Sequence, residues 1–79
     1  KEKKIMLPSV EEAKHFEQEA TKCDFDIDVF YNRVTIDAKS ILGVLSLDLA
    51  RVLTVQMNGD NAEFEEYLDT LAPVSTTAA

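Results

Sequence analysis

The chain has 79 residues, 46% of them hydrophobic, with only two glycines and two prolines. This length allows one domain with one core, and this composition favours a folded domain over a disordered chain. The formal net charge of −7 opposes binding to nucleic acid or to a membrane surface, because both require concentrated Lys and Arg on the protein.

The first predicted elements are a short strand at Lys3–Leu7 and a helix that ends near Lys22. Pro8 ends the strand, because proline has no backbone N–H to donate to a sheet. Ser9 is a good N-cap, and Glu12 stands three residues later, where a capping box has its glutamate. The helix is amphipathic, and its apolar stripe consists of Ala13, Phe16, Ala20 and Cys23.

The residues after this helix predict a β-hairpin. From Phe25 to Tyr31 apolar residues recur at every second position, which is typical of a half-buried strand. Val34 and Ile36 continue the alternation, so we expect a tight turn near Tyr31 to Arg33 and a third strand that ends near Asp37.

The second half of the chain predicts a short apolar helix, a strand and a last helix. Ser40 is an N-cap candidate for a helix at 41–47, and Val52–Met57 reads as a fourth strand. Asn58 and Gly59 turn the chain, and Asp60 or Asn61 caps a helix that reaches Leu71.

This order predicts an α+β fold in which a four-stranded antiparallel sheet carries three helices on one face. Residues 1–71 form the domain, and residues 72–79 are expected to be a disordered tail. We expect the core to contain Phe16, Ile27, Val29, Ile36, Val44, Leu53, Val55, Phe64 and Leu68.

Cysteine and histidine each occur once. Cys23 has no partner for an internal disulfide and no catalytic His with Asn or Asp nearby, so it reads as a small buried hydrophobe. With no secretory pattern and no bilayer-spanning apolar run in the sequence, we expect a cytoplasmic protein. His15 falls in the middle of the first helix and reads as an ordinary, partly exposed residue. No residue pattern indicates a metal site or a cofactor.

The segment Ala38–Leu47, which reads Ala-Lys-Ser-Ile-Leu-Gly-Val-Leu-Ser-Leu, resembles the HPr family, the phosphocarriers of the bacterial sugar phosphotransferase system (PTS). Tyr31 and Asn32 are similar to the hairpin of that family, and the order of elements agrees over nearly the whole domain. The resemblance implies the HPr fold, an open-faced sandwich with the order βαββαβα.

The resemblance fails at the residue that carries phosphate in the family. HPr proteins have a His-X-Arg-Pro stretch at the start of their first helix, and the matching residues here are Ser9, Val10, Glu11 and Glu12. A serine hydroxyl forms no labile phosphoramidate, and Glu11 repels a phosphoryl group that arginine would hold. His15 lies too near Ser40 in the sequence to match the family's histidine. The resemblance therefore implies that no residue is catalytic.

The resemblance also implies a regulatory site and a docking surface. In the family a dedicated kinase phosphorylates the serine that matches Ser40, whereas the alternative is that Ser40 only caps its helix. Ile41, Leu42 and Leu45 keep the apolar character of the family's partner-facing patch, although part of this patch could equally be core. Positions that are basic in the family, such as those of Glu11 and Gln18, are not basic here.

We therefore expect a diverged HPr-like protein that is not an enzyme and works as a regulatory or adaptor module. The catabolite-repression HPr-like proteins are a family precedent, because they also lack the histidine and keep the serine. Its partners would be proteins, such as HPr kinase or a transcriptional regulator. The alternative is a working phosphocarrier that uses His15 or an unrecognised acceptor.

Overall fold

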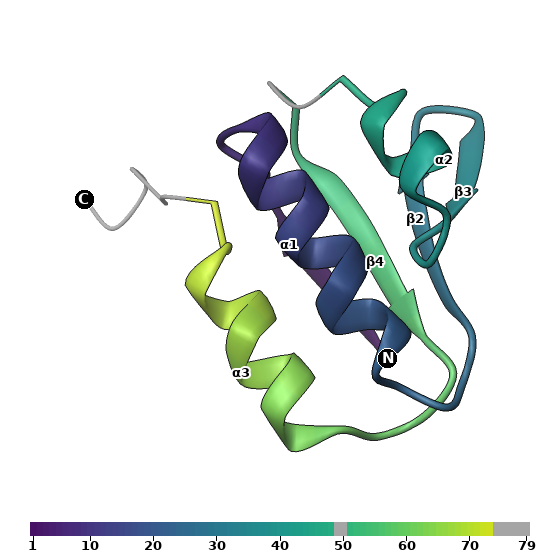
Figure 1. Cartoon of the computed structure of the whole chain (residues 1–79), viewed down its shortest axis with the longest axis vertical. Coiled ribbons are helices and arrows are strands. Elements are labelled where there is room, and N and C mark those ends of the chain that lie inside the picture. Colours follow the sequence, from purple (N-terminus) through teal and green to yellow (C-terminus); the bar gives the residue numbers. More distant parts are fainter. Residues whose placement is uncertain (49–50, 74–79) are drawn as a thin grey trace.

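The computed structural model describes residues 1–48 and 51–73, and it has a four-stranded antiparallel sheet with three helices on one face (Figure 1). The predicted fold class and order of elements are confirmed. In chain order the elements are β1 (Glu2–Ile5), α1 (Val10–Thr21), β2 (Ile27–Tyr31), β3 (Val34–Asp37), α2 (Ile41–Leu45), β4 (Leu53–Met57) and α3 (Ala62–Thr70).

The strands lie in the order β1-β4-β2-β3, so the first strand pairs with the last. In the centre of the sheet Val29 pairs with Val55 on one side and with Ile36 on the other. Asn32 and Arg33 form the predicted hairpin turn, and Asn32 adopts a left-handed conformation with φ 54°. Asparagine tolerates this conformation better than most residues, which explains a tight turn without glycine.

The core lies between the sheet and the three helices, and it contains almost every residue that the sequence pattern predicts. The exception is Ile36, which is only half-buried because β3 is an edge strand. Alternate strand residues face the helices and are completely or almost completely buried together with the apolar stripes of α1 and α3; they include Ile5, Ile27, Val29, Leu53, Val55, Met57, Phe16, Phe64 and Leu68.

Several element boundaries differ from the prediction. β1 ends at Ile5, although Leu7 beyond it is fully buried as an irregular residue. Phe25 precedes β2, and its ring packs on Gly59, where a Cβ atom would lie 2.4 Å from the ring. α2 ends at Leu45, two residues before the predicted 47, and Asn61 rather than Asp60 caps α3.

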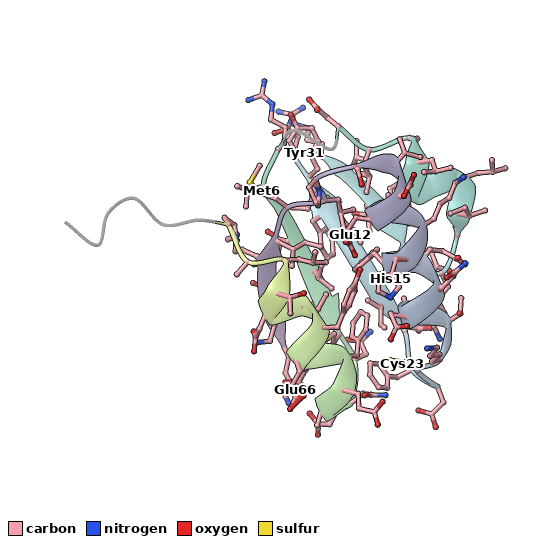
Figure 2. All side chains as sticks on the ribbon, turned by 60° about the vertical axis from the view of Figure 1, so that its left-hand side comes forward. Met6, Glu12, His15, Cys23, Tyr31 and Glu66 are labelled. Atoms are coloured by element: carbon pink, nitrogen blue, oxygen red, sulfur yellow. The ribbon has the colours of Figure 1, made fainter. Side chains whose placement is uncertain are left out.

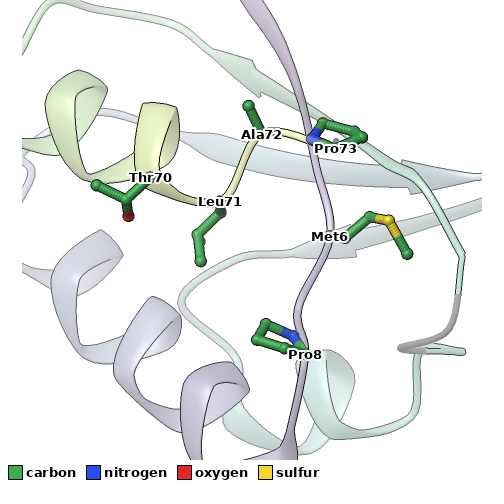
Figure 3. A pocket seen from close by; sticks show the side chains of 6 residues that line it. All are labelled: Met6, Pro8, Thr70, Leu71, Ala72 and Pro73. Carbon is green, nitrogen blue, oxygen red and sulfur yellow. The ribbon is translucent and has the colours of Figure 1, made fainter. Parts of the chain in front are cut away.

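The predicted tail is only partly described, because residues 74–79 lie outside the described residues. Leu71 is buried at the end of the domain, and its carbonyl accepts a hydrogen bond from the Met6 N–H at 2.8 Å. Ala72 and Pro73 follow and line an open apolar groove of about 250 Å³ together with side chains from the β1–α1 connection (Figure 3).

Candidate functional site

Ser9, which the resemblance matches to the family's histidine, caps α1. It has extended backbone angles, and its Oγ accepts a hydrogen bond from the Glu12 N–H at 3.1 Å. The neighbours Val10 and Glu11 are exposed to solvent. This end of α1 therefore presents a hydroxyl and a carboxylate, and it offers neither the imidazole nor the guanidinium on which histidine phosphotransfer depends.

Glu12 makes only half of the predicted capping box. Its backbone N–H is capped by Ser9, but its carboxylate turns to α3, where Oε2 accepts a hydrogen bond from the Tyr67 hydroxyl at 2.5 Å. Burial, and after it the Glu12 carboxylate, raises the pKa of the Tyr67 phenol well above its usual value. The sequence pattern did not predict this bond between α1 and α3. The only signal was the residue type, because a buried tyrosine hydroxyl usually finds a partner.

His15 lies between two carboxylates on the face of α1 that meets α3 (Figure 2). Its Nδ1 is 3.1 Å from Glu12 Oε2, its Nε2 is 3.5 Å from Glu19 Oε2, and its ring centroid is 4.8 Å from that of Tyr67. About half of the side chain (52%) is exposed, as predicted. A phosphoryl group on either nitrogen would approach a carboxylate, so the surroundings of His15 oppose phosphate at this residue.

Ser40 is exposed and caps α2. Its Oγ accepts a hydrogen bond from the Gly43 N–H at 3.3 Å, so the predicted N-cap is confirmed. The preceding Lys39 reaches the end of α1, where its Nζ donates to the backbone carbonyl of Cys23 at 2.7 Å. Ser40 is therefore exposed to solvent, and the ammonium group of its neighbour Lys39 binds the Cys23 carbonyl.

The three apolar residues at 41, 42 and 45 do not share one environment. Leu42 is 80% exposed and Ile41 is 36% exposed, whereas Leu45 is half-buried and packs against the core. Val10, at the start of α1, is 53% exposed. Figure 1 shows α1 between α3 and α2. Each of the two neighbouring helices thus has exposed apolar side chains, Val10 on α1 and Leu42 on α2.

The remaining candidates carry no chemistry of their own. Cys23 is buried, and this burial raises the pKa of its thiol, which fits a structural residue. Within residues 1–48 and 51–73, no group of three or more His, Cys, Asp or Glu side chains is arranged to hold a metal ion. Within the same residues, no helix has the length and hydropathy needed to cross a membrane.

Comparison with known proteins places this arrangement in a family. The family model of the PTS HPr component phosphorylation site matches residues 10–76. Among solved structures, HPr-C-His from Thermoanaerobacter tengcongensis is similar with a TM-score of 0.73 at 28% identity, over 89% of this chain and 88% of that chain. The phosphocarrier protein HPr from Bacillus anthracis is similar with a TM-score of 0.70 at 26% identity, over 92% and 96%.

A third structure, the Bacillus subtilis catabolite repression containing protein Crh, described as a swapped dimer, has a TM-score of 0.63 at 26% identity, over 84% of this chain and 79% of that chain. The resemblance of the segment 38–47 thus extends to a family match over most of the chain and to agreement of the whole fold. The chain belongs to the HPr family of the bacterial phosphotransferase system.

Proposed function

We propose that this protein is a regulatory or adaptor member of the HPr family that does not carry phosphate on histidine and binds protein partners in the cytoplasm. The observation that supports it most is the state of Ser9. We take Ser9 as the counterpart of the family's histidine and Glu11 as the counterpart of its arginine. The Ser9 Oγ accepts a hydrogen bond from the Glu12 N–H. We also propose that the chain is not an enzyme and that residues 1–71 form the functional domain.

The proposed partner-binding residues are Ile41, Leu42 and Leu45. Leu42 is the best candidate for the centre of the contact, because an 80% exposed leucine gains most from being covered. Ile41 would add to the contact, and Leu45 would support it from the core. HPr kinase and a transcriptional regulator are the partners that we propose for this surface.

The proposed regulatory site is Ser40. Its exposure allows a kinase to reach the hydroxyl, and its place beside Ile41 and Leu42 would put a phosphate at the edge of the docking surface. The similarity to Crh, a catabolite repression containing protein, also supports a regulatory role. Purified HPr kinase should label the protein, and Ser40→Ala should remove the label.

The deciding experiment incubates the protein with Enzyme I and phosphoenolpyruvate and measures phosphate by mass spectrometry under alkaline conditions. We expect no acid-labile phosphohistidine, whereas an ordinary HPr in the same assay should be fully labelled. A Ser9→His, Glu11→Arg variant is the matched control, because it restores the two missing groups on the same fold. Label on the unaltered protein that disappears in His15→Ala would refute the proposal and establish the competing carrier function.

The docking surface needs a separate test. Leu42→Ser should weaken binding to HPr kinase at least tenfold, whereas Val34→Ser should not weaken it, because Val34 is 46% exposed but lies on the edge strand β3. The free energy of unfolding of each variant should lie within about 0.5 kcal/mol of that of the unaltered protein, since both residues are exposed. Equal binding by the two variants would show that α2 is not the contact.

A further inference from the structure

The side chain of Lys39 joins the start of α2 to the end of α1. Its ammonium group donates to the carbonyl of Cys23 at 2.7 Å, while its backbone N–H donates to Asp37 Oδ1 at 2.9 Å. Cys23 directly follows Lys22, the C-cap of α1. Lys39 therefore binds a backbone carbonyl at the end of the helix, where cationic side chains commonly stabilise the unpaired carbonyl groups.

A phosphate on Ser40 would lie within reach of this ammonium group. The Cα atoms of adjacent residues are about 3.8 Å apart, and the lysine side chain is long and flexible. Lys39 is also the only basic residue from Asp37 to Gly43. No other cation in this stretch of sequence can neutralise the added charge.

The phosphate and the Cys23 carbonyl would then compete for one ammonium group. The bond to the Cys23 carbonyl has one charged partner, whereas a bond to the phosphate would have two, so the Coulomb attraction between opposite charges favours the phosphate. The Asp37 carboxylate lies in the same turn as Ser40, and its negative charge further favours an ammonium group beside the phosphate. We infer that phosphorylation of Ser40 draws Lys39 away from Cys23 and releases the end of α1 from the start of α2.

This inference rests on the proposed function, because it takes Ser40 as the modified residue. The phosphate on Ser40 then acts in two ways. It places negative charge beside Leu42, and it removes a bond that holds α1 and α2 together. Since Lys39 joins the start of α2 to the end of α1, it is the residue that transmits the modification from one helix to the other.

The test incorporates phosphoserine at position 40 during synthesis, so it does not depend on a kinase. The carbonyl carbon chemical shift of Cys23, measured by NMR, reports its hydrogen bond directly. In the phosphorylated protein this shift should move to the value of unphosphorylated Lys39→Gln, and the amides of Lys22 and Cys23 should exchange about fivefold faster. In Lys39→Gln itself, phosphorylation should leave the Cys23 shift unchanged.

Lys22→Gln is the matched control, because it removes a cation at the same helix end that binds Glu19 at 2.8 Å. In this variant the response to phosphorylation should equal that of the unaltered protein. A Cys23 carbonyl that does not respond to phosphoserine, or that responds equally in Lys39→Gln, would overturn the inference. If HPr kinase fails to label the protein but incorporated phosphoserine moves the carbonyl shift, the proposed regulation fails and the role of Lys39 stands.

Discussion

Replacing Gly43 by alanine should destabilise the protein, although alanine favours a helix interior over glycine by about 0.5–1 kcal/mol. The reason is the close approach of α2 to β3. A Cβ atom on Gly43 would lie 2.6 Å from Ile36 Cγ2 and 3.3 Å from Ser40 Oγ, the oxygen that caps α2. Overpacking of this kind costs about 1–3 kcal/mol, so we expect a net loss of about 1 kcal/mol.

The same substitution should become stabilising when the opposing methyl group is removed. In an Ile36→Ala background, Gly43→Ala should raise the free energy of unfolding by up to about 0.5–1 kcal/mol, because the 2.6 Å contact is gone and the helix preference outweighs the looser approach to Ser40 Oγ at 3.3 Å. Urea denaturation of the four proteins of this cycle, followed by circular dichroism, measures both effects. If Gly43→Ala stabilised both backgrounds equally, the close contact between α2 and β3 would not be what excludes a larger residue.

Three further outcomes follow from the contacts of single residues. Because the pKa of the Tyr67 phenol is raised in the folded protein, the unfolded chain loses this proton first, and stability falls as the pH rises past about 10. Tyr67→Phe should remove that fall. Near neutral pH it should lower the free energy of unfolding by about 1 kcal/mol, because the bond to Glu12 is lost. Urea titrations near neutral pH and above about pH 10 would measure both effects. Asp28 lies directly opposite Asp37 in the sheet, so Asp28→Asn should stabilise the protein by about 0.2–1 kcal/mol at low ionic strength, and a gain that persists in high salt would contradict a charge effect. Leu68→Ala should cost about 2–5 kcal/mol in thermal or urea unfolding through the cavity it leaves, and a loss below 1 kcal/mol would mean that the site collapses around the smaller residue.

The fold could be predicted from the sequence because its signals are local. The N-caps Ser9 and Ser40 and the alternation in β2 each depend on residues within a few positions of one another. The bond between Glu12 and Tyr67 could not be predicted, because it joins residues 55 positions apart. The capping box predicted a local role for the Glu12 carboxylate, and tertiary packing gave this group a different partner.

In the candidate site, the cap on α2 was predictable, because Ser40 and the helix that it caps are adjacent in the sequence. The sequence left open which apolar residues of α2 are exposed, and the structure exposes Leu42 and half-buries Leu45. Lys39, by contrast, stood out only as a neighbour of Ser40, because no sequence pattern reveals that its ammonium group reaches the carbonyl of Cys23. Contacts of this kind depend on how α1 and α2 pack, and only the folded chain shows them.

Because β1 pairs with β4, the earliest of the four strands in the chain waits for the latest of them before it can pair. Within the described residues, β4 is the only strand beside β1, and Lys3 pairs with Val55 across most of the chain length. Closing so long a loop is slow compared with forming the α1 helix or the β2–β3 hairpin. During synthesis Ile5 and Leu7 therefore lack their native surroundings until β4 and α3, which packs on β1, have emerged, and in that interval they are open to chaperones or to another unfinished chain.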